Sequence, residues 1–243
     1  MPYANINDIN MYYEISGIGE PLLIIWGMGG EIGSFVEQLK KVTDYQLITF
    51  DNRGTGRTDK PDNKYSIEIM AEDTINLLDE LKIQSVNILG ISMGSRIAIT
   101  LAAKYPDRVK NLILNVAAAR SPQNTDKNSE MAYERLEAAS KNPEVLKAMG
   151  KYPPNSKSFM RLFDALTSFN GKHLLKYIKA PTIIINGTQD PSTPLKCAKE
   201  LHNGIINSKL ILVEENHFFI RNKPGLLIQD LVKFIDQKNK YLK

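Results

Sequence analysis

The stretch GISMGS, residues 90–95, joins an apolar run of strand type, SVNIL, to a helical pattern, RIAITLAAKY. A strand that turns sharply into a helix can hold a serine on the turn, and flanking glycines then let strand and helix approach closely. A serine that only caps a helix has no use for glycines at both flanking positions. With Gly90 and Gly94 in place, the stretch predicts that Ser92 is a nucleophile rather than a helix cap.

Short apolar runs of the length of buried strands recur along the chain, with amphipathic helical patterns between them. This alternation predicts a mostly parallel sheet with right-handed crossovers and helices on both faces. Residues 2–17 predict two short strands around an Asn/Asp turn, which we expect to form an antiparallel edge. The runs are PLLIIWG (21–27), QLITFD (46–51), SVNILGI (85–91), NLILNVA (111–117), TIIING (182–187) and KLILVEEN (209–216).

Residues 118–180 interrupt the alternation, because they carry helical patterns and no strand pattern. Ordinary connections in such domains have about 2 to 6 residues. An insertion of this length predicts a helical lid. We therefore expect a core formed by residues 1–117 and 181–243, with the lid inserted between its two halves.

Composition indicates a globular chain: 243 residues, 42% of them apolar and 24% charged. The net charge of +4 comes from scattered lysines interleaved with acids, so nucleic acid is not an expected partner. No apolar run approaches the roughly 20 residues of a membrane span, and residues 1–14 show neither the basic start and apolar core nor the cleavage site of a secretion signal. With one cysteine, Cys197, there is no intramolecular disulfide. We expect a cytoplasmic protein without a membrane partner, as a monomer or homodimer.

A nucleophilic serine needs a base within hydrogen-bond reach. The chain has three histidines, and two of them, His173 and His202, lie within helical patterns. His217 instead follows the last apolar run. Parallel strands place their carboxyl ends at one edge of a sheet, so His217 is expected beside Ser92 as the base.

The imidazole of such a base is oriented by a carboxylate, which also stabilises its charged form. Asp190 follows the run TIIING and is the expected partner. Glu214 and Glu215, close to His217 in sequence, are competing carboxylates. The chain order of serine, aspartate and histidine favours Asp190.

Acyl transfer through a tetrahedral intermediate also needs two backbone N–H groups directed at the oxyanion. Met93, directly after Ser92, is expected to supply one and Met28 the other, since Met28 lies in a glycine-rich loop after the first apolar run. This loop lacks both the lysine of a phosphate-binding loop and the dinucleotide-binding spacing. No metal or organic cofactor is expected.

Together these motifs resemble the α/β-hydrolase-fold family, in its small form with one lid. Further resemblances lie in DNRGTGRT (51–58), which is similar to the family's D-x-R-G-x-G-x-S stretch, in GTQDPSTP and in ENHFF. The resemblance implies an eight-stranded, mostly parallel sheet with the lid after the sixth strand, and a catalytic triad of Ser92, Asp190 and His217. It also implies that Arg53 is chiefly structural.

The chain departs from the family pattern at Trp26, where the family commonly has histidine. Its indole is a candidate for the lining of the substrate pocket, as is Phe218. Apolar residues of the predicted lid are further candidates, and packing of lid on core is the alternative for each. These lid residues are Met131, Met149, Phe159, Phe163 and Phe169.

The expected reaction is hydrolysis of a small, partly apolar ester or lactone through an acyl-enzyme. Two alternatives stay open. Ser-Met-Gly-Ser-Arg (92–96) resembles a stretch of the carbon-carbon lyases of the menaquinone pathway, in which the arginine helps bind a carboxylated substrate; Arg96 would do so here. The other alternative is a ligand receptor on a hydrolase scaffold, since a fold does not fix a function.

Overall fold

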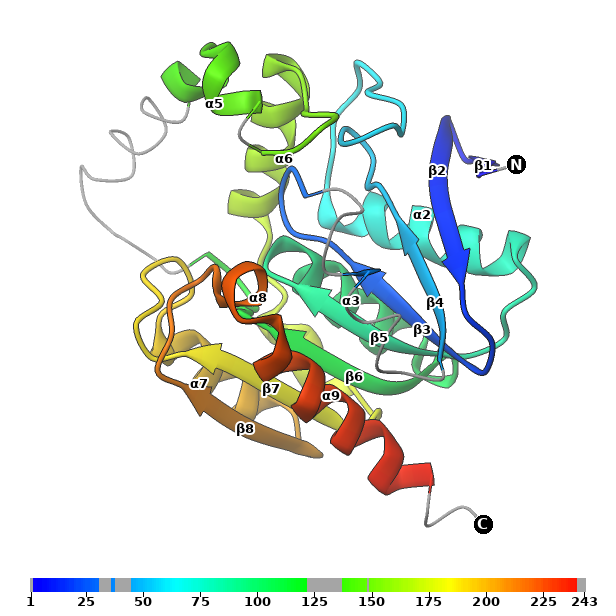
Figure 1. Ribbon diagram of the computed structural model, residues 1–243, viewed down its shortest axis with the longest axis vertical. Coiled ribbons are helices and arrows are strands. Elements are labelled where there is room, and N and C mark those ends of the chain that lie inside the picture. Colours follow the sequence, from blue (N-terminus) through cyan, green and yellow to red (C-terminus); the bar gives the residue numbers. More distant parts are fainter. Residues whose placement is uncertain (1, 31–35, 38–44, 122–136, 148, 240–243) are drawn as a thin grey trace.

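An eight-stranded sheet runs through the computed structural model, which describes residues 2–30, 36–37, 45–121, 137–147 and 149–239. Its strand order is β1-β2-β4-β3-β5-β6-β7-β8, and Figure 1 shows its twist. The strands are β1 (Tyr3–Ile6), β2 (Ile9–Ser16), β3 (Glu20–Ile25), β4 (Tyr45–Phe50), β5 (Val86–Ile91), β6 (Val109–Asn115), β7 (Thr182–Gly187) and β8 (Ser208–Val213).

The sheet has an antiparallel edge and a parallel remainder. β1 pairs with β2 and β2 with β4 in antiparallel fashion, whereas the pairs from β4 through β8 are parallel. Asn7 turns the chain between β1 and β2 with a φ of 51°, a conformation that asparagine adopts more readily than most residues. The predicted antiparallel edge and parallel core are both confirmed.

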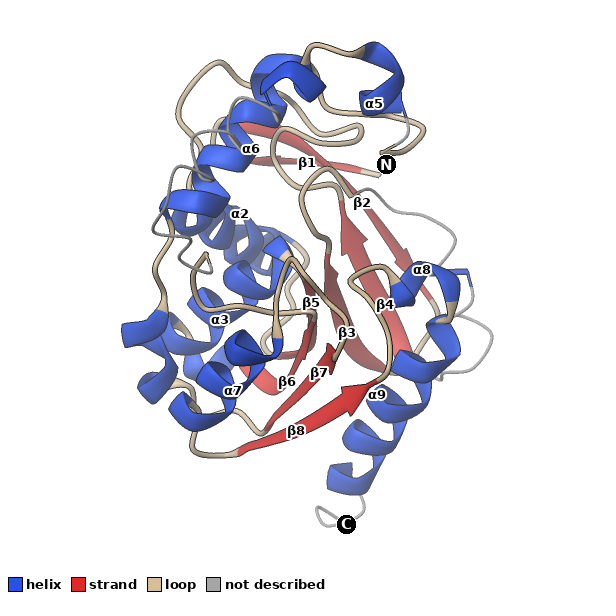
Figure 2. Cartoon of the chain, turned by 90° about the vertical axis from the view of Figure 1, so that its left-hand side faces the viewer, coloured by secondary structure: helices blue, strands red, loops and turns tan. Residues whose placement is uncertain are grey.

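Helices cover both faces of the sheet (Figure 2). On one face lie α2 (Ile67–Glu80), α3 (Met93–Lys104) and α7 (Leu195–Gly204), and on the other lies α9 (Pro224–Asn239), preceded by the short α8 (Phe219–Asn222). Strand residues alternate between the two cores, since Leu23 and Ile25 pack with the α2–α3 side and Leu22 and Ile24 with the α9 side. Among the described helices, none has the length and apolar character needed to cross a bilayer.

Arg53 links the loop after β4 to α2 and to the turn between β1 and β2. Its guanidinium binds the buried Asp73 of α2 (Nε to Oδ2, 2.7 Å) and Asp8 of the β1–β2 turn (Nη2 to Oδ1, 2.7 Å). The hydrogen bond from Arg53 lowers the pKa of the half-exposed Asp8 to about 2. These contacts give Arg53 a structural role.

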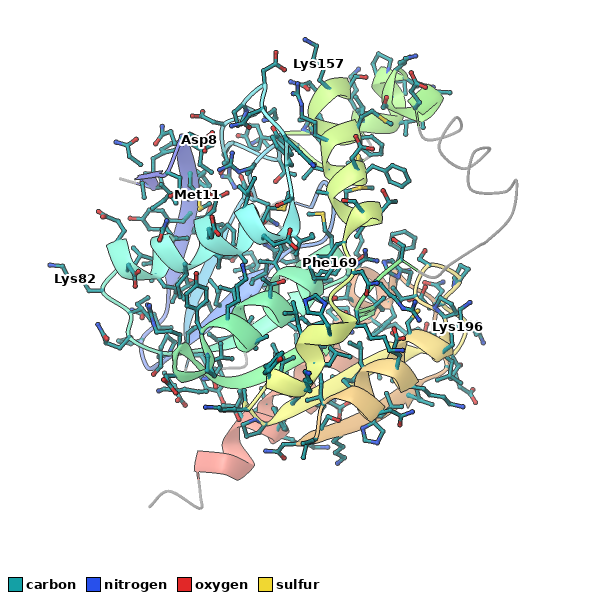
Figure 3. The ribbon with its side chains drawn as sticks, turned by 180° about the vertical axis from the view of Figure 1, so that it is seen from behind. Asp8, Met11, Lys82, Lys157, Phe169 and Lys196 are labelled. Atoms are coloured by element: carbon teal, nitrogen blue, oxygen red, sulfur yellow. The ribbon has the colours of Figure 1, made fainter. Side chains whose placement is uncertain are left out.

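The segment between β6 and β7 is helical where it is described. It contains α5 (Pro143–Lys147), α6 (Ser156–Ser168) and the 3₁₀ helix η2 (Lys172–Tyr177). α5 and α6 stand beyond the carboxyl ends of the strands (Figure 1). In Figure 3, Lys157 marks the outer end of α6, while Phe169 marks the inner end, where the chain returns to the core. Residues 122–136, which include Met131 of the predicted lid, lie outside the described residues.

Candidate active site

Ser92 lies on the turn between β5 and α3, as the sequence predicts. Its φ of 53° and ψ of −116° are rare for a residue with a side chain, and such a conformation costs of the order of 1–3 kcal/mol. Its side chain makes no capping hydrogen bond to α3. The helix-cap alternative therefore receives no support, and the turn instead presents the hydroxyl beyond the end of the strand.

The two glycines beside Ser92 lie where side chains would collide with the core. A Cβ at Gly94 would overlap the carbonyl oxygen of Ile25 and lie 2.6 Å from that of Trp26. A Cβ at Gly90 would lie 2.8 Å from the Cβ of Ala98. The close packing of β5, α3 and the end of β3 therefore requires glycine at both positions.

Gly94→Ala is expected to lower the free energy of unfolding by about 1–3 kcal/mol, because the added methyl group meets backbone rather than a movable side chain. Urea denaturation measures the change. Gly225→Ala is the matched control, since a Cβ there has no neighbour within 4 Å. It should leave stability equal or slightly increased. Equal stabilities of the two variants would contradict the packing argument.

His217 bridges Ser92 and Asp190. Its Nε2 lies 3.0 Å from Ser92 Oγ, and its Nδ1 lies 2.7 Å from Asp190 Oδ2. The three side chains come from the carboxyl ends of β5, β7 and β8, and the parallel sheet brings them together although up to 125 positions separate them. This is the arrangement in which an imidazole can take a proton from a serine hydroxyl.

The other histidines and carboxylates lie elsewhere. The Nδ1 of His202 lies 2.9 Å from Ser208 Oγ, and His173 is exposed on the helix η2. Glu214 is exposed, and Glu215 forms an ion pair with Lys223. The structure thus places Asp190 against His217 and not the competing glutamates.

The Asp190 carboxylate is buried and well supplied with donors. Burial raises its pKa, but hydrogen bonds from His217 and from the side chain and backbone of Thr193 outweigh burial, so that the net shift is downward. The backbone N–H groups of Ser192 and Thr193 donate to Oδ1 at 2.8 and 2.9 Å. A carboxylate held in this way remains ionised near neutral pH. Thr193 is not among the residues that the sequence predicts for the site, and its place three residues after Asp190 is the only sequence signal for this contact.

The loop after β3 lies directly against Ser92. A Cβ at Gly27 would be 3.2 Å from the Cβ of Ser92, and the Gly30 N–H closes a turn by donating to the Gly27 carbonyl at 3.0 Å. Met28 lies within this turn, and Met93 is the first residue of α3. The start of α3 at Met93 favours negative charge, as helix N-termini do.

The two predicted pocket residues lie in different surroundings. The Trp26 side chain packs in the core on the α9 side of the sheet, and its Nε1–H donates to Thr49 Oγ1 at 2.7 Å. Phe218 is 56% exposed, and its ring meets the His217 ring edge-on at a centroid distance of 5.4 Å. The structure therefore places Phe218 beside His217 and buries most of Trp26 next to the loop after β3.

The apolar residues of the insertion also separate into two groups. Phe159 and Phe169 are buried, and Phe169 belongs to the core packed around α3. The Met149 methyl group packs directly against Gly29 of the loop after β3. Met149 thus brings the insertion next to the loop that borders Ser92.

Arg96, four residues after Ser92, is only 4% exposed. Its Nη1 donates to the Leu166 carbonyl of α6 and to Ser121 Oγ, and burial lowers its pKa to about 10. No carboxylate in the described ranges pairs with it. Its contacts hold the end of α6 against α3, which is a packing role, so no observation favours the carboxylate-binding role that the lyase alternative requires.

The sequence that forms this sheet and site matches a known protein family. Residues 20–149 match the profile of the alpha/beta hydrolase fold, and the protein is a member of that family.

Named relatives narrow the class to hydrolytic enzymes. The chain is 28% identical to RutD of Azorhizobium caulinodans, a candidate carbamate hydrolase, over 98% of this chain and all of that protein. It is also 28% identical to the human serine hydrolase BPHL, over 86% of this chain and 77% of that one. Among solved structures, an esterase from Exiguobacterium antarcticum superposes with a TM-score of 0.84 at 25% identity, covering 96% of this chain and 98% of that one. The protein is therefore an enzyme of the hydrolase type.

Proposed function

We propose that this enzyme is a serine hydrolase that cleaves a carboxylic ester or lactone of a small, partly apolar substrate. The observation that carries the proposal is the continuous chain from Ser92 Oγ through His217 to Asp190, with contacts of 3.0 and 2.7 Å. The relatives named as serine hydrolase and esterase support it.

In the proposed reaction, Ser92 Oγ attacks the acyl carbon while His217 Nε2 takes the hydroxyl proton. Asp190 accepts a hydrogen bond from Nδ1, which sets the imidazole tautomer and stabilises its positive charge. When the acyl carbon–oxygen bond breaks, His217 returns the proton to the leaving oxygen. Water, deprotonated by the same imidazole, then attacks the acyl-enzyme. As the bond between Ser92 Oγ and the acyl carbon breaks, His217 returns that proton to Oγ and the acid is released.

The oxyanion of each tetrahedral intermediate would lie between the turn at Met28 and the start of α3 at Met93. Donors already fixed by packing need no rearrangement as the charge develops, which makes such a site effective. Gly27 lies within contact distance of Ser92, so the turn at Met28 is close to the serine that would attack the substrate. The backbone N–H groups of Met28 and Met93 are the proposed donors.

The helical insertion is proposed to act as the lid of this site. Met149 connects it to the loop after β3, and Arg161 connects α6 to the loop after β4 by a 2.5 Å ion pair with Asp62. Met149 and Phe218 give the proposed pocket an apolar character suited to an acyl or alcohol group. We also keep the expectation of a cytoplasmic monomer or homodimer acting on small molecules.

Covalent labelling tests the proposal. A fluorophosphonate probe should label about one serine per chain, because the activated Ser92 attacks phosphorus as it would an acyl carbon. Turnover of nitrophenyl esters of two to twelve acyl carbons, and of simple lactones, would establish the substrate class. An unlabelled protein that turns over none of these compounds would refute it.

A further inference from the structure

The Oδ2 atom of Asp190 receives two hydrogen bonds, only one of which comes from the histidine. His217 Nδ1 lies 2.7 Å away, and the hydroxyl of Thr193 donates to the same oxygen at 2.6 Å. An ionised carboxylate can only accept, so the Thr193 hydroxyl must be the donor. The oxygen that orients the imidazole is therefore shared with a threonine.

Thr193 is itself held in place from the sheet. Its residue is 6% exposed, and its carbonyl accepts a hydrogen bond from the buried Asn186 Nδ2 at 2.9 Å. Asn186 also donates to the carbonyl of Gly187 at 3.1 Å. The backbone of Thr193 is thus held by β7 through a second buried side chain, which keeps the residue beside Asp190.

We propose that Thr193 is a positioning residue for the catalytic histidine. Its hydroxyl fixes the Oδ2 atom of Asp190 and draws off part of the charge that this atom presents to His217. The proposal rests on the proposed hydrolase function, because it assigns Thr193 a task within that triad.

A donor on a carboxylate oxygen has two effects on the partner imidazole. It restricts rotation of the carboxylate, which keeps the imidazole aligned with Ser92. It also weakens the negative field at the imidazole, which favours the neutral base. Loss of the hydroxyl would therefore misalign the base and, at the same time, make it easier to protonate.

The other charged and titratable groups near Asp190 and His217 stay the same when Thr193 alone is changed. Cys197 of α7 interacts electrostatically with Asp190, and also with Lys196 of α7 and Arg96 of α3. Glu215 of the histidine loop is paired with Lys223. None of these five residues donates a hydrogen bond to Asp190 in the described structure. Removal of the Thr193 hydroxyl is therefore the change that should shift the titration of His217.

Thr193→Val removes the hydroxyl and keeps the branched shape of the side chain. We expect kcat to fall about 3- to 10-fold with KM changed less than about twofold, since one positioning hydrogen bond is lost. The acid limb of the kcat/KM profile should move up by about 0.3–1 pH unit. Thr193→Ser, which restores the hydroxyl, should return both quantities to within about twofold and 0.2 pH unit of wild type.

A substrate-free measurement separates this proposal from the hydrolase proposal. Histidine ¹⁵N NMR follows the titration of His217 directly, with its signal assigned by its loss in His217→Gln. An upward midpoint shift in Thr193→Val, reversed in Thr193→Ser, would support the positioning role even if no ester were turned over. An unshifted midpoint in a folded valine variant, or a serine variant that behaves like valine, would overturn it.

Discussion

Ser92→Ala is expected to lower kcat/KM by about 10⁴-fold or more for every ester that the wild type hydrolyses. The substitution removes the oxygen that lies 3.0 Å from His217 Nε2 and leaves no other nucleophile on the turn. Residual hydrolysis would come from water held near the remaining oxyanion donors. Steady-state kinetics with a nitrophenyl ester, together with loss of fluorophosphonate labelling, measures the effect.

Loss of folded structure must be excluded as the cause of that lower activity. Alanine keeps the Cβ of Ser92 and the same strained backbone, so the melting temperature should stay close to that of the wild type. Ser66→Ala is the control: the Ser66 hydroxyl accepts from the Ile69 N–H and caps α2, so its removal should cost about 1 kcal/mol of stability and leave kcat nearly unchanged. A Ser92→Ala enzyme that retained a tenth of wild-type activity would show that another residue attacks the substrate.

The strands and the neighbourhood of the triad could be predicted because both follow from short-range patterns. Each buried strand appears as an apolar run, and the parallel arrangement follows from the helices between the runs. Once the strands are parallel, residues just after their carboxyl ends must share one edge of the sheet. Ser92, Asp190 and His217 each follow a strand, so sequence alone predicted their meeting.

The direction of a side chain was harder to predict, and Trp26 shows why. Trp26 directly follows β3, at a position where the resemblance to the hydrolase family suggested a pocket residue. Yet Leu22, Ile24 and Trp26 lie two residues apart and pack on the same face of the sheet, in the core on its α9 side. Side chains of a strand alternate between the two faces of a sheet, and this alternation continues from β3 to Trp26 just after it. The alternation was therefore the sequence signal that the indole is buried.

Contacts between distant segments gave no sequence signal at all. Arg96 donates to the carbonyl of Leu166, 70 positions away, and a backbone acceptor leaves no trace in residue type. The same holds for Met149 against Gly29, where a flexible side chain meets bare backbone. Such contacts depend on how the helical insertion returns to the core, which local patterns do not specify.

Arg53→Met should be the most destabilising of the charge removals in this core, lowering the free energy of unfolding by about 3–5 kcal/mol. The guanidinium contacts both oxygens of Asp73, at 2.7 and 2.9 Å, and the Asp73 side chain is 1% exposed. Without Arg53, this carboxylate keeps only the hydrogen bond from Asn7 among the side-chain contacts described. Urea denaturation would measure the loss.

The cause should be the unpaired Asp73 charge rather than the lost volume of arginine. Adding Asp73→Asn to Arg53→Met removes that charge, so the double variant should be more stable than Arg53→Met alone. Each single substitution should be destabilising on its own. Arg161→Met breaks an ion pair with Asp62, whose side chain is 72% exposed, together with hydrogen bonds to the carbonyls of Pro61 and Asp62. It should destabilise the protein much less than Arg53→Met, because water screens that ion pair. If Arg53→Met and Arg161→Met unfolded at the same urea concentration, burial of the Arg53 pair would not be what stabilises the loop after β4.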